Sequence, residues 1–222
     1  MLDTDYWTLI FMRALVTCFE PFGGESINAS LEAVRRLPAR IAAIDVITAE
    51  LPTSYARSLP ALEAAIARAQ PEIVLCVGQA HDRAVLCVER IAVNVQDTKN
   101  ADNDGARPVD EPIVPGAPAA YLSTLPVRAL VAALRAEELP AHLSMSAGTF
   151  VCNHVFYRLM HLAAARRDPF IGGFLHVPGL PQQTTGNAAA MALDDIVRAI
   201  EIVLEAAAGG KALSSVEGAN DR

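Results

Sequence analysis

Short apolar runs alternate with helical patterns along this 222-residue chain, and that alternation restricts the fold more than any other feature. The run EIVLCVG (72–78) is short, apolar and β-branched, as expected of a strand covered on both faces. Between such runs, apolar residues recur at helical spacing. We therefore predict an α/β fold, a single-domain three-layer α/β/α sandwich with a mixed, mostly parallel sheet of the phosphorylase or hydrolase type. The expected strands cover 13–18, 43–51, 72–78, 84–97, 141–146 and 170–178, and the expected helices cover 28–37, 54–69, 126–138, a segment from 152, and 186–208.

The two ends of the chain differ from this pattern. Residues 1–11 contain two Asp and no Lys or Arg, unlike the basic start of a secretory signal. Since Met12 could be the natural initiator, we treat 1–11 as an N-terminal extension whose native status the sequence leaves open. We expect one catalytic domain over 12–208, and we predict that the polar, Gly- and Ser-containing segment 209–222 is disordered.

Composition excludes several classes of partner. The formal net charge of −7 argues against binding to nucleic acid or to an anionic membrane. No apolar run approaches the roughly 18 residues that span a bilayer. The four cysteines show no C-x-x-C spacing, so we expect free thiols in a reducing cytoplasm, and we see no cluster of metal ligands. Because only 5% of residues are aromatic, aliphatic side chains are expected to fill the core.

The stretch SAGTFVCNHVFY (146–157) contains the candidate nucleophile. Residues 149–151 favour a strand, and helical spacing follows Cys152. A thiol at the start of a helix meets unpaired backbone N–H groups and the positive end of the helix dipole, which lower its pKa. The alternative is that Cys152 is a buried packing residue, since free cysteine is among the most buried residue types.

A cysteine nucleophile needs a base and a group that orients the base. Of the five histidines we favour His176, which ends an apolar strand, although the pattern alone leaves others open; the side chain of His154 would point away from Cys152 on a helix. Glu89 is a charged residue within the apolar run LCVERIAVNV, so it needs a partner, which could equally be a structural cation such as Arg90. Ligands gather at the carboxyl ends of strands, and Cys152 and His176 both follow or end predicted strands.

Five motifs, in order, resemble those of the pyroglutamyl peptidase I (pyrrolidone-carboxylate peptidase) family of cysteine peptidases. They are VTCFEPFGG, VGQAHDR, VERIAVNVQDTKNADNDG, AGTFVCNHVFY and GFLHVPGLPQQ. The resemblance implies a cytoplasmic cysteine exopeptidase that forms a homotetramer or homodimer and removes N-terminal 5-oxoproline from blocked peptides through a thioester. It assigns Cys152 as nucleophile, His176 as base and Glu89 as its partner, and it implies no cofactor.

The resemblance also implies a pocket for the small, neutral oxoproline ring. Gln79 would bond the lactam as donor or acceptor, and Phe19, Phe22, Phe150 and Val151 would supply apolar walls. The chain departs from the family pattern at several positions near this pocket, which puts affinity and specificity in doubt rather than the triad. Cys18 replaces a Gly, His81 and Asp82 replace two Gly, Lys99 replaces an Arg, and Asn100 and Ala101 replace an apolar residue and a Pro.

Two other motifs resemble binding sites, and two rival functions fit the predicted fold. NADNDGARPVDE places acidic and amide residues at EF-hand positions, but Pro108 and the missing flanking helices favour an ordinary turn over a calcium site. FGGES lacks the Lys-Ser/Thr of a phosphate-binding loop. The enzymatic rival is a phosphorylase-like enzyme on the same scaffold, which would not need Cys152. The other is a catalytically weakened relative that binds blocked peptides without cleaving them.

Overall fold

The computed structural model of the chain describes residues 12–81, 83–166, 170–183 and 190–220. The expected extension 1–11 lies outside these residues. A seven-stranded sheet with the order β2-β3-β1-β4-β9-β5-β8 forms the centre, and β6 and β7 form a small sheet beside it. The strands are β1 (Met12–Phe19), β2 (Arg40–Ile41), β3 (Ile44–Leu51), β4 (Ile73–Gln79), β5 (Leu86–Glu89), β6 (Ile91–Val93), β7 (Ala120–Leu122), β8 (Ala141–Ser144) and β9 (Ile171–Val177).

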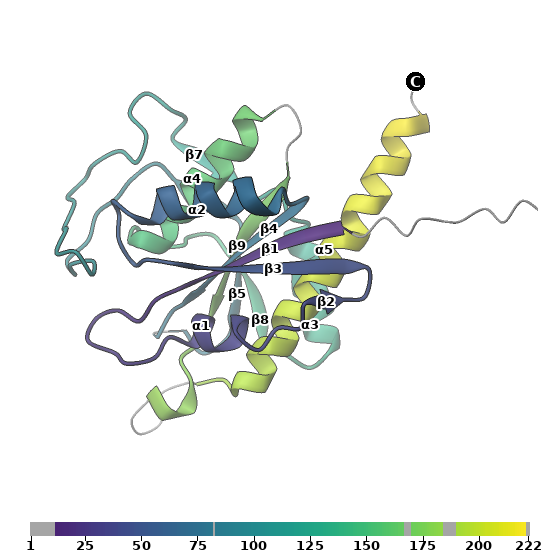
Figure 1. Ribbon diagram of the computed structural model, residues 1–222, viewed down its shortest axis with the longest axis horizontal. Helices are drawn as coiled ribbons and strands as arrows, with labels where there is room; N and C mark the ends of the chain where they lie inside the picture. Colours follow the sequence, from purple (N-terminus) through teal and green to yellow (C-terminus); the bar gives the residue numbers. More distant parts are fainter. Residues whose placement is uncertain (1–11, 82, 167–169, 184–189, 221–222) are drawn as a thin grey trace, which may run out of the picture.

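Helices cover both faces of the main sheet (Figure 1). The helices α2 (Ser58–Ala69) and α4 (Val151–Ala165) lie on one face, and α1 (Ala29–Val34), α3 (Val127–Ala136) and α5 (Leu193–Asn220) lie on the other. This arrangement confirms the predicted α/β/α fold. Within the described residues no helix is both long and apolar enough to cross a membrane.

The main sheet is mixed, as predicted, and its strand directions matter for the site. Strands β3, β1, β4 and β9 are parallel to one another, so their carboxyl ends share one edge. Strand β5 is antiparallel to β9, and β8 is parallel to β5, so both run the opposite way. Side chains that follow β1, β3, β4 and β9 therefore meet at one edge, while those that follow β5 and β8 do not.

The alternation of side chains along each strand assigns them to the two faces. In β4, Ile73, Leu75 and Val77 pack under α1, α3 and α5, whereas Val74 and Cys76 face α2 and α4. In β9, Leu175 packs on the side of α1, α3 and α5, and Phe174 packs on the side of α2 and α4. His176 shares the parity of Phe174, so its side chain also faces α4.

Two predicted elements differ from the structure. The predicted extended segment 84–97 is divided at Arg90. Strand β5 belongs to the main sheet and ends at Glu89, whereas β6 pairs with β7 in the small sheet. The expected last helix, 186–208, ends later than predicted, because helix α5 continues to Asn220, into the segment 209–222 for which we predict disorder. The segment lacks proline, and its Ala, Lys and Leu are good helix formers that extend an already nucleated helix. The expected start of this helix at 186 lies outside the described residues.

Candidate active site

The candidate nucleophile, Cys152, is the second residue of helix α4. The prediction that residues 149–151 continue a strand is wrong, since β8 ends at Ser144 and the helix begins at Val151. Because β8 runs opposite to β9, Cys152 does not arrive at the common carboxyl edge by following a strand. Instead, residues 145–150 lead back over the sheet to the start of α4. The helix is then held by its apolar face, in which Val155, Phe156 and Leu159 are fully buried.

Gly78 of β4 allows the sulfur of Cys152 to lie against the sheet. A Cβ atom built on Gly78 would be 3.1 Å from Cys152 Sγ and 2.8 Å from the Cζ atom of Phe174. A side chain at position 78 would therefore force the sulfur or the aromatic ring to move. Gly78 is paired in register with His176 of β9, so the sulfur, the glycine and the imidazole belong to one small area of the sheet.

His176 and Glu89 form a buried hydrogen-bonded pair. Glu89 lies opposite Phe174 in the antiparallel β5–β9 ladder, diagonal to His176 and on the same face. His176 Nδ1 donates to Glu89 Oε1 at 2.8 Å, with side-chain exposures of 5% and 0%. With its proton on Nδ1, the imidazole presents an unprotonated Nε2 that can accept a proton.

Arg83 is a residue of this site to which the sequence reasoning assigned no role. Its Nη1 atom lies 2.5 Å from Glu89 Oε1, the oxygen that also accepts from His176. Its Nη2 atom donates to the carbonyl of Ser146 at 2.9 Å, in the segment that leads to the nucleophile. Glu89 thus has both of the partners that the sequence left open, an imidazole and a cation, but the cation is Arg83 rather than Arg90. The sequence did contain a signal for Arg83, because this residue comes just after β4, at the carboxyl edge of the parallel strands.

The surroundings of the Cys152 thiol favour its protonated form. Burial, followed by the charge of Glu89, raises its pKa to about 12, although Arg83 and the backbone N–H of Cys152 itself act in the lowering direction. The expectation of a lowered pKa was therefore wrong: the helix start is present, but desolvation outweighs it. Such a thiol becomes a nucleophile when an adjacent base removes its proton, rather than by resting as a thiolate.

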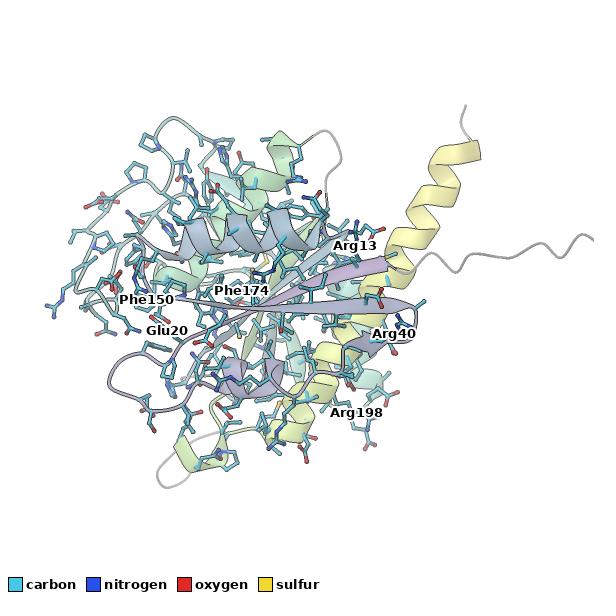
Figure 2. All side chains as sticks on the ribbon, viewed as in Figure 1. Arg13, Glu20, Arg40, Phe150, Phe174 and Arg198 are labelled. Atoms are coloured by element: carbon cyan, nitrogen blue, oxygen red, sulfur yellow. The ribbon has the colours of Figure 1, made fainter. Side chains whose placement is uncertain are left out.

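A cavity of about 370 Å³ lies over Cys152 and His176, and we call it the Cys152 cavity. All five predicted pocket residues line it: Phe19, Phe22, Gln79, Phe150 and Val151. Glu89 lies behind His176 and outside this lining. Figure 2 shows Phe150 and Glu20 at the end of the sheet opposite Arg13 and Arg40, and Phe174 nearer its middle.

The cavity wall also contains residues that the sequence reasoning passed over. Asn28, Thr53 and Ala147 are among them. Thr53 follows β3 by two residues, so the same carboxyl-edge argument would have found it. Asn28 caps α1 by accepting from the backbone of Ser30, and its position follows from that cap.

The amide of Gln79 has a fixed orientation. Its Oε1 atom accepts from the backbone N–H of Ala29 and, at 3.3 Å, from Nε2 of Gln183. Its Nε2 atom consequently serves as the donor, and it approaches the ring of His81 to 2.6 Å. His81 lines the same cavity, while its neighbour Asp82 lies outside the described residues.

The remaining histidines have structural surroundings. His154 Nδ1 is hydrogen-bonded to Gln96 Oε1 at 2.9 Å, and burial lowers the pKa of His154 to about 4. His161 bonds the hydroxyl of Tyr121, and His142 lies opposite Cys87 on an outer strand. None of the three lines the Cys152 cavity.

The EF-hand-like segment forms a turn, as the sequence favoured. The carboxylate of Asp102 accepts from the backbone N–H groups of Tyr55, Asp104 and Ala106, which commits its oxygens to the loop itself. Asp104 is bonded by Arg57 and Ser54. These contacts stabilise the loop and tie it to the segment that follows β3.

A thiol at a helix start, a buried imidazole–carboxylate pair and an apolar cavity over them are the features of an α/β cysteine hydrolase. The model of the peptidase C15 family, pyroglutamyl peptidase, matches residues 12–209. The chain therefore belongs to this family, whose members are cysteine peptidases that remove N-terminal pyroglutamate.

Individual relatives agree with this assignment. The chain is 43% identical over 201 residues to the pyrrolidone-carboxylate peptidase of Treponema denticola, covering 88% of this chain and 93% of that one. It is 47% identical over 194 residues to pyrrolidone-carboxylate peptidase 1 of Ralstonia nicotianae, covering 86% and 90%. The crystal structure of Bacillus amyloliquefaciens pyroglutamyl peptidase I is 40% identical with a TM-score of 0.85, covering 89% and 97%.

Proposed function

We propose that Cys152, His176 and Glu89 hydrolyse the amide bond that follows an N-terminal 5-oxoprolyl residue. The observation that carries the proposal is that the thiol and the imidazole of a His176–Glu89 pair line one apolar cavity. Glu89 fixes the proton on Nδ1 and stabilises the imidazolium that forms when Nε2 accepts the thiol proton. Arg83 holds the same carboxylate and is a positioning residue.

The oxoproline ring is recognised by shape and by one directed amide. Phe19, Phe22 and Phe150 supply apolar contact surface, and a small lactam ring fits a cavity of about 370 Å³. Since Oε1 of Gln79 is already occupied by Ala29 N–H, its Nε2 group donates to the lactam carbonyl. In the free protein this donor faces His81, so the substrate carbonyl replaces the imidazole as its acceptor.

Acylation starts with a neutral thiol. As Cys152 Sγ attacks the carbonyl carbon of the oxoprolyl group, its proton passes to Nε2 of His176 and a C–S bond forms. The tetrahedral oxyanion is stabilised by backbone N–H groups in the first turn of α4, which have no acceptor within the helix. Phe150, the residue before the helix, makes no side-chain cap with them. Each such donor is worth about 2.7–4 kcal/mol in the transition state.

Collapse of this intermediate breaks the C–N bond, and His176 gives its proton to the departing amine. The thioester that remains is hydrolysed by water, from which His176 accepts a proton. The acid formed is free 5-oxoproline, and the thiol regains its proton.

The test is release of a fluorescent amine from oxoprolyl-aminomethylcoumarin, compared with the prolyl analogue. The prolyl ring lacks the lactam carbonyl and carries a cationic amine, so we expect it to react at least about a hundredfold more slowly. Alkylation with iodoacetamide should stop turnover. No release by a folded protein with an intact Cys152 thiol would contradict the proposal and leave a protein that only binds blocked peptides. Turnover that survives complete alkylation of Cys152 would contradict the role of the sulfur.

We propose further that the protein acts in a reducing cytoplasm as a homodimer or homotetramer. All four cysteines are free thiols, which suits a reducing compartment. Multi-angle light scattering of the purified chain measures the oligomeric state, and a monomer at micromolar concentration would contradict that part of the proposal.

A further inference from the structure

A second cavity, which we call the Lys99 cavity, lies beside the Cys152 cavity. It has a volume of about 680 Å³ and shares two wall residues with the first, Phe22 and Phe150. The centroids of these two rings are 6.0 Å apart, so they form a common border between the cavities. The remaining wall comes from Gly23, residues 98–101 and Arg107.

The two cavities differ in charge. The wall of the Lys99 cavity contains two cations, Lys99 and Arg107, and no acidic residue among the described residues that line it. Both cations are exposed, and neither takes part in an ion pair with another described residue. Their charges are therefore available to a ligand.

Three carboxylates in or against this loop, those of Asp102, Asp104 and Glu20, are engaged by other groups. Asp102 accepts from three backbone N–H groups, and Asp104 is held by Arg57. Glu20 accepts from the backbone of Thr53 and from Asn103. None of these three lines the cavity. Lys99 and Arg107 thus line the cavity, while Asp102 and Asp104 stabilise the turn.

The loop that carries the cations is fixed relative to the nucleophile. Thr98 donates its N–H to the carbonyl of Pro108 at 3.1 Å, which brings the segments of Lys99 and Arg107 together. Thr149 donates its hydroxyl to the carbonyl of Asp97 at 2.5 Å, and the N–H of Asp97 returns to the carbonyl of Thr149 at 3.2 Å. Thr149 is three residues before Cys152, so the cavity wall and the reacting sulfur are joined by a short, bonded path.

From this arrangement we propose that the Lys99 cavity binds the peptide that follows the oxoprolyl residue and favours a carboxylate side chain there. The inference rests on the proposed function. With the oxoproline ring in the Cys152 cavity, the rest of the substrate has to leave it, and the Phe22–Phe150 border opens onto two unpaired cations. An acidic side chain at the first or second position after the cleaved bond would be attracted to Lys99 and Arg107.

The experiment compares amidated peptides that differ only in charge. Oxoprolyl-Glu-Ala-amide and oxoprolyl-Ala-Glu-amide are each paired with the peptide in which Gln replaces Glu. At low salt we expect kcat/KM for one or both Glu peptides to exceed that of the Gln peptide by about threefold to fivefold. Near 1 M salt, where the screening length is about 3 Å, the ratio should approach one.

Variants locate the effect. The ratio of Glu-peptide to Gln-peptide kcat/KM should fall in Lys99→Gln and in Arg107→Gln, and reach about one in the double variant. Arg128→Gln is the matched control, because it removes an exposed cation from α3, on the other side of the sheet. It should leave the ratio unchanged.

The outcomes separate this inference from the proposed function. If all four peptides are cleaved at equal rates, the charge subsite is wrong and the peptidase function stands. If the ratio persists in the double variant or disappears in Arg128→Gln, the selectivity does not come from the Lys99 cavity. If no oxoprolyl amide is cleaved at all, the proposed function itself is contradicted.

Discussion

The two faces of the main sheet are built from different side chains. Under α1, α3 and α5, the described core consists of aliphatic residues with Cys18 and Met191, and it contains no aromatic ring. Under α2 and α4, the core contains five aromatic residues, Phe19, Phe156, Tyr157, Phe170 and Phe174. Aliphatic residues therefore fill most of the core on both faces, as expected, and aromatic rings join them on one face only.

The difference reflects what each face has to do. Aliphatic side chains of similar size fill space without leaving voids, and they tolerate replacement by one another. The other face must keep a cavity open beside a thiol and a buried charged pair. Large planar rings that contact each other can line such a space, as Phe174 does with Phe19, Phe156 and His176. One face therefore contributes mainly stability, while the other contributes stability and chemistry together.

The largest expected contrast compares two cysteines, one on each face. Cys152→Ala should lower kcat by about 10⁴-fold or more, as loss of a catalytic nucleophile does, with unchanged circular dichroism. Cys18→Ala removes a thiol that is 2% exposed in the aliphatic core and outside the Cys152 cavity, so kcat/KM should not change. Equal losses in the two variants would show that sulfur at position 152 has no special role.

Core truncation should separate the faces next. Leu130→Ala, in the aliphatic core, should cost about 2–5 kcal/mol of unfolding free energy and leave the kcat/KM of folded protein unchanged. Phe174→Leu should lower both quantities, because its ring contacts that of His176 at a centroid distance of 4.7 Å. Urea unfolding and the fluorogenic assay measure the two effects. A Phe174→Leu variant that is destabilised but fully active would contradict the coupling.

A pH dependence of the free energy of unfolding should arise on the face covered by α2 and α4. Burial lowers the pKa of His154 from 6.5 to about 4, so the unfolded state binds a proton at higher pH than the folded state does. Stability from this group is complete above pH 6.5 and is lost as pH falls toward 4, by up to about 3 kcal/mol. His154→Gln should reduce this slope in urea unfolding between pH 7 and 4. An unchanged slope would assign it to other groups.

The smallest expected effect concerns Arg83 and separates geometry from charge. Lysine cannot bond Glu89 and the carbonyl of Ser146 together as Arg83 does, so Arg83→Lys should lower kcat by about tenfold to a hundredfold. Arg83→Gln also removes the cation that acts to lower the pKa of Cys152. Alkylation of Cys152 at pH 8–9 should therefore be slower in this variant than in the wild type. Equal alkylation rates in wild type and Arg83→Gln would contradict the electrostatic part.

Much of the fold and the candidate site could be predicted from local pattern. The buried run of β4 and the amphipathic helices follow from the period of their apolar residues, which is a property of neighbouring residues. The motifs were sufficient to pick Cys152, His176 and the five pocket residues that line its cavity. The end of helix α5 was missed because the polar, Gly- and Ser-containing segment after residue 208 favoured disorder, whereas a helix with a long packed portion continues into it.

The amino-acid sequence by itself determined which side chains face each side of every strand, since alternation along a strand requires no knowledge of its partners. Only the tertiary structure decided that β5 and β8 run against β9, which places Glu89 diagonal to His176 and brings Cys152 in from the far edge. It also decided that Arg83 shares the oxygen of Glu89 and that burial raises the pKa of the Cys152 thiol. The reason is that strand order and desolvation depend on contacts between residues far apart in the chain, which no local pattern records.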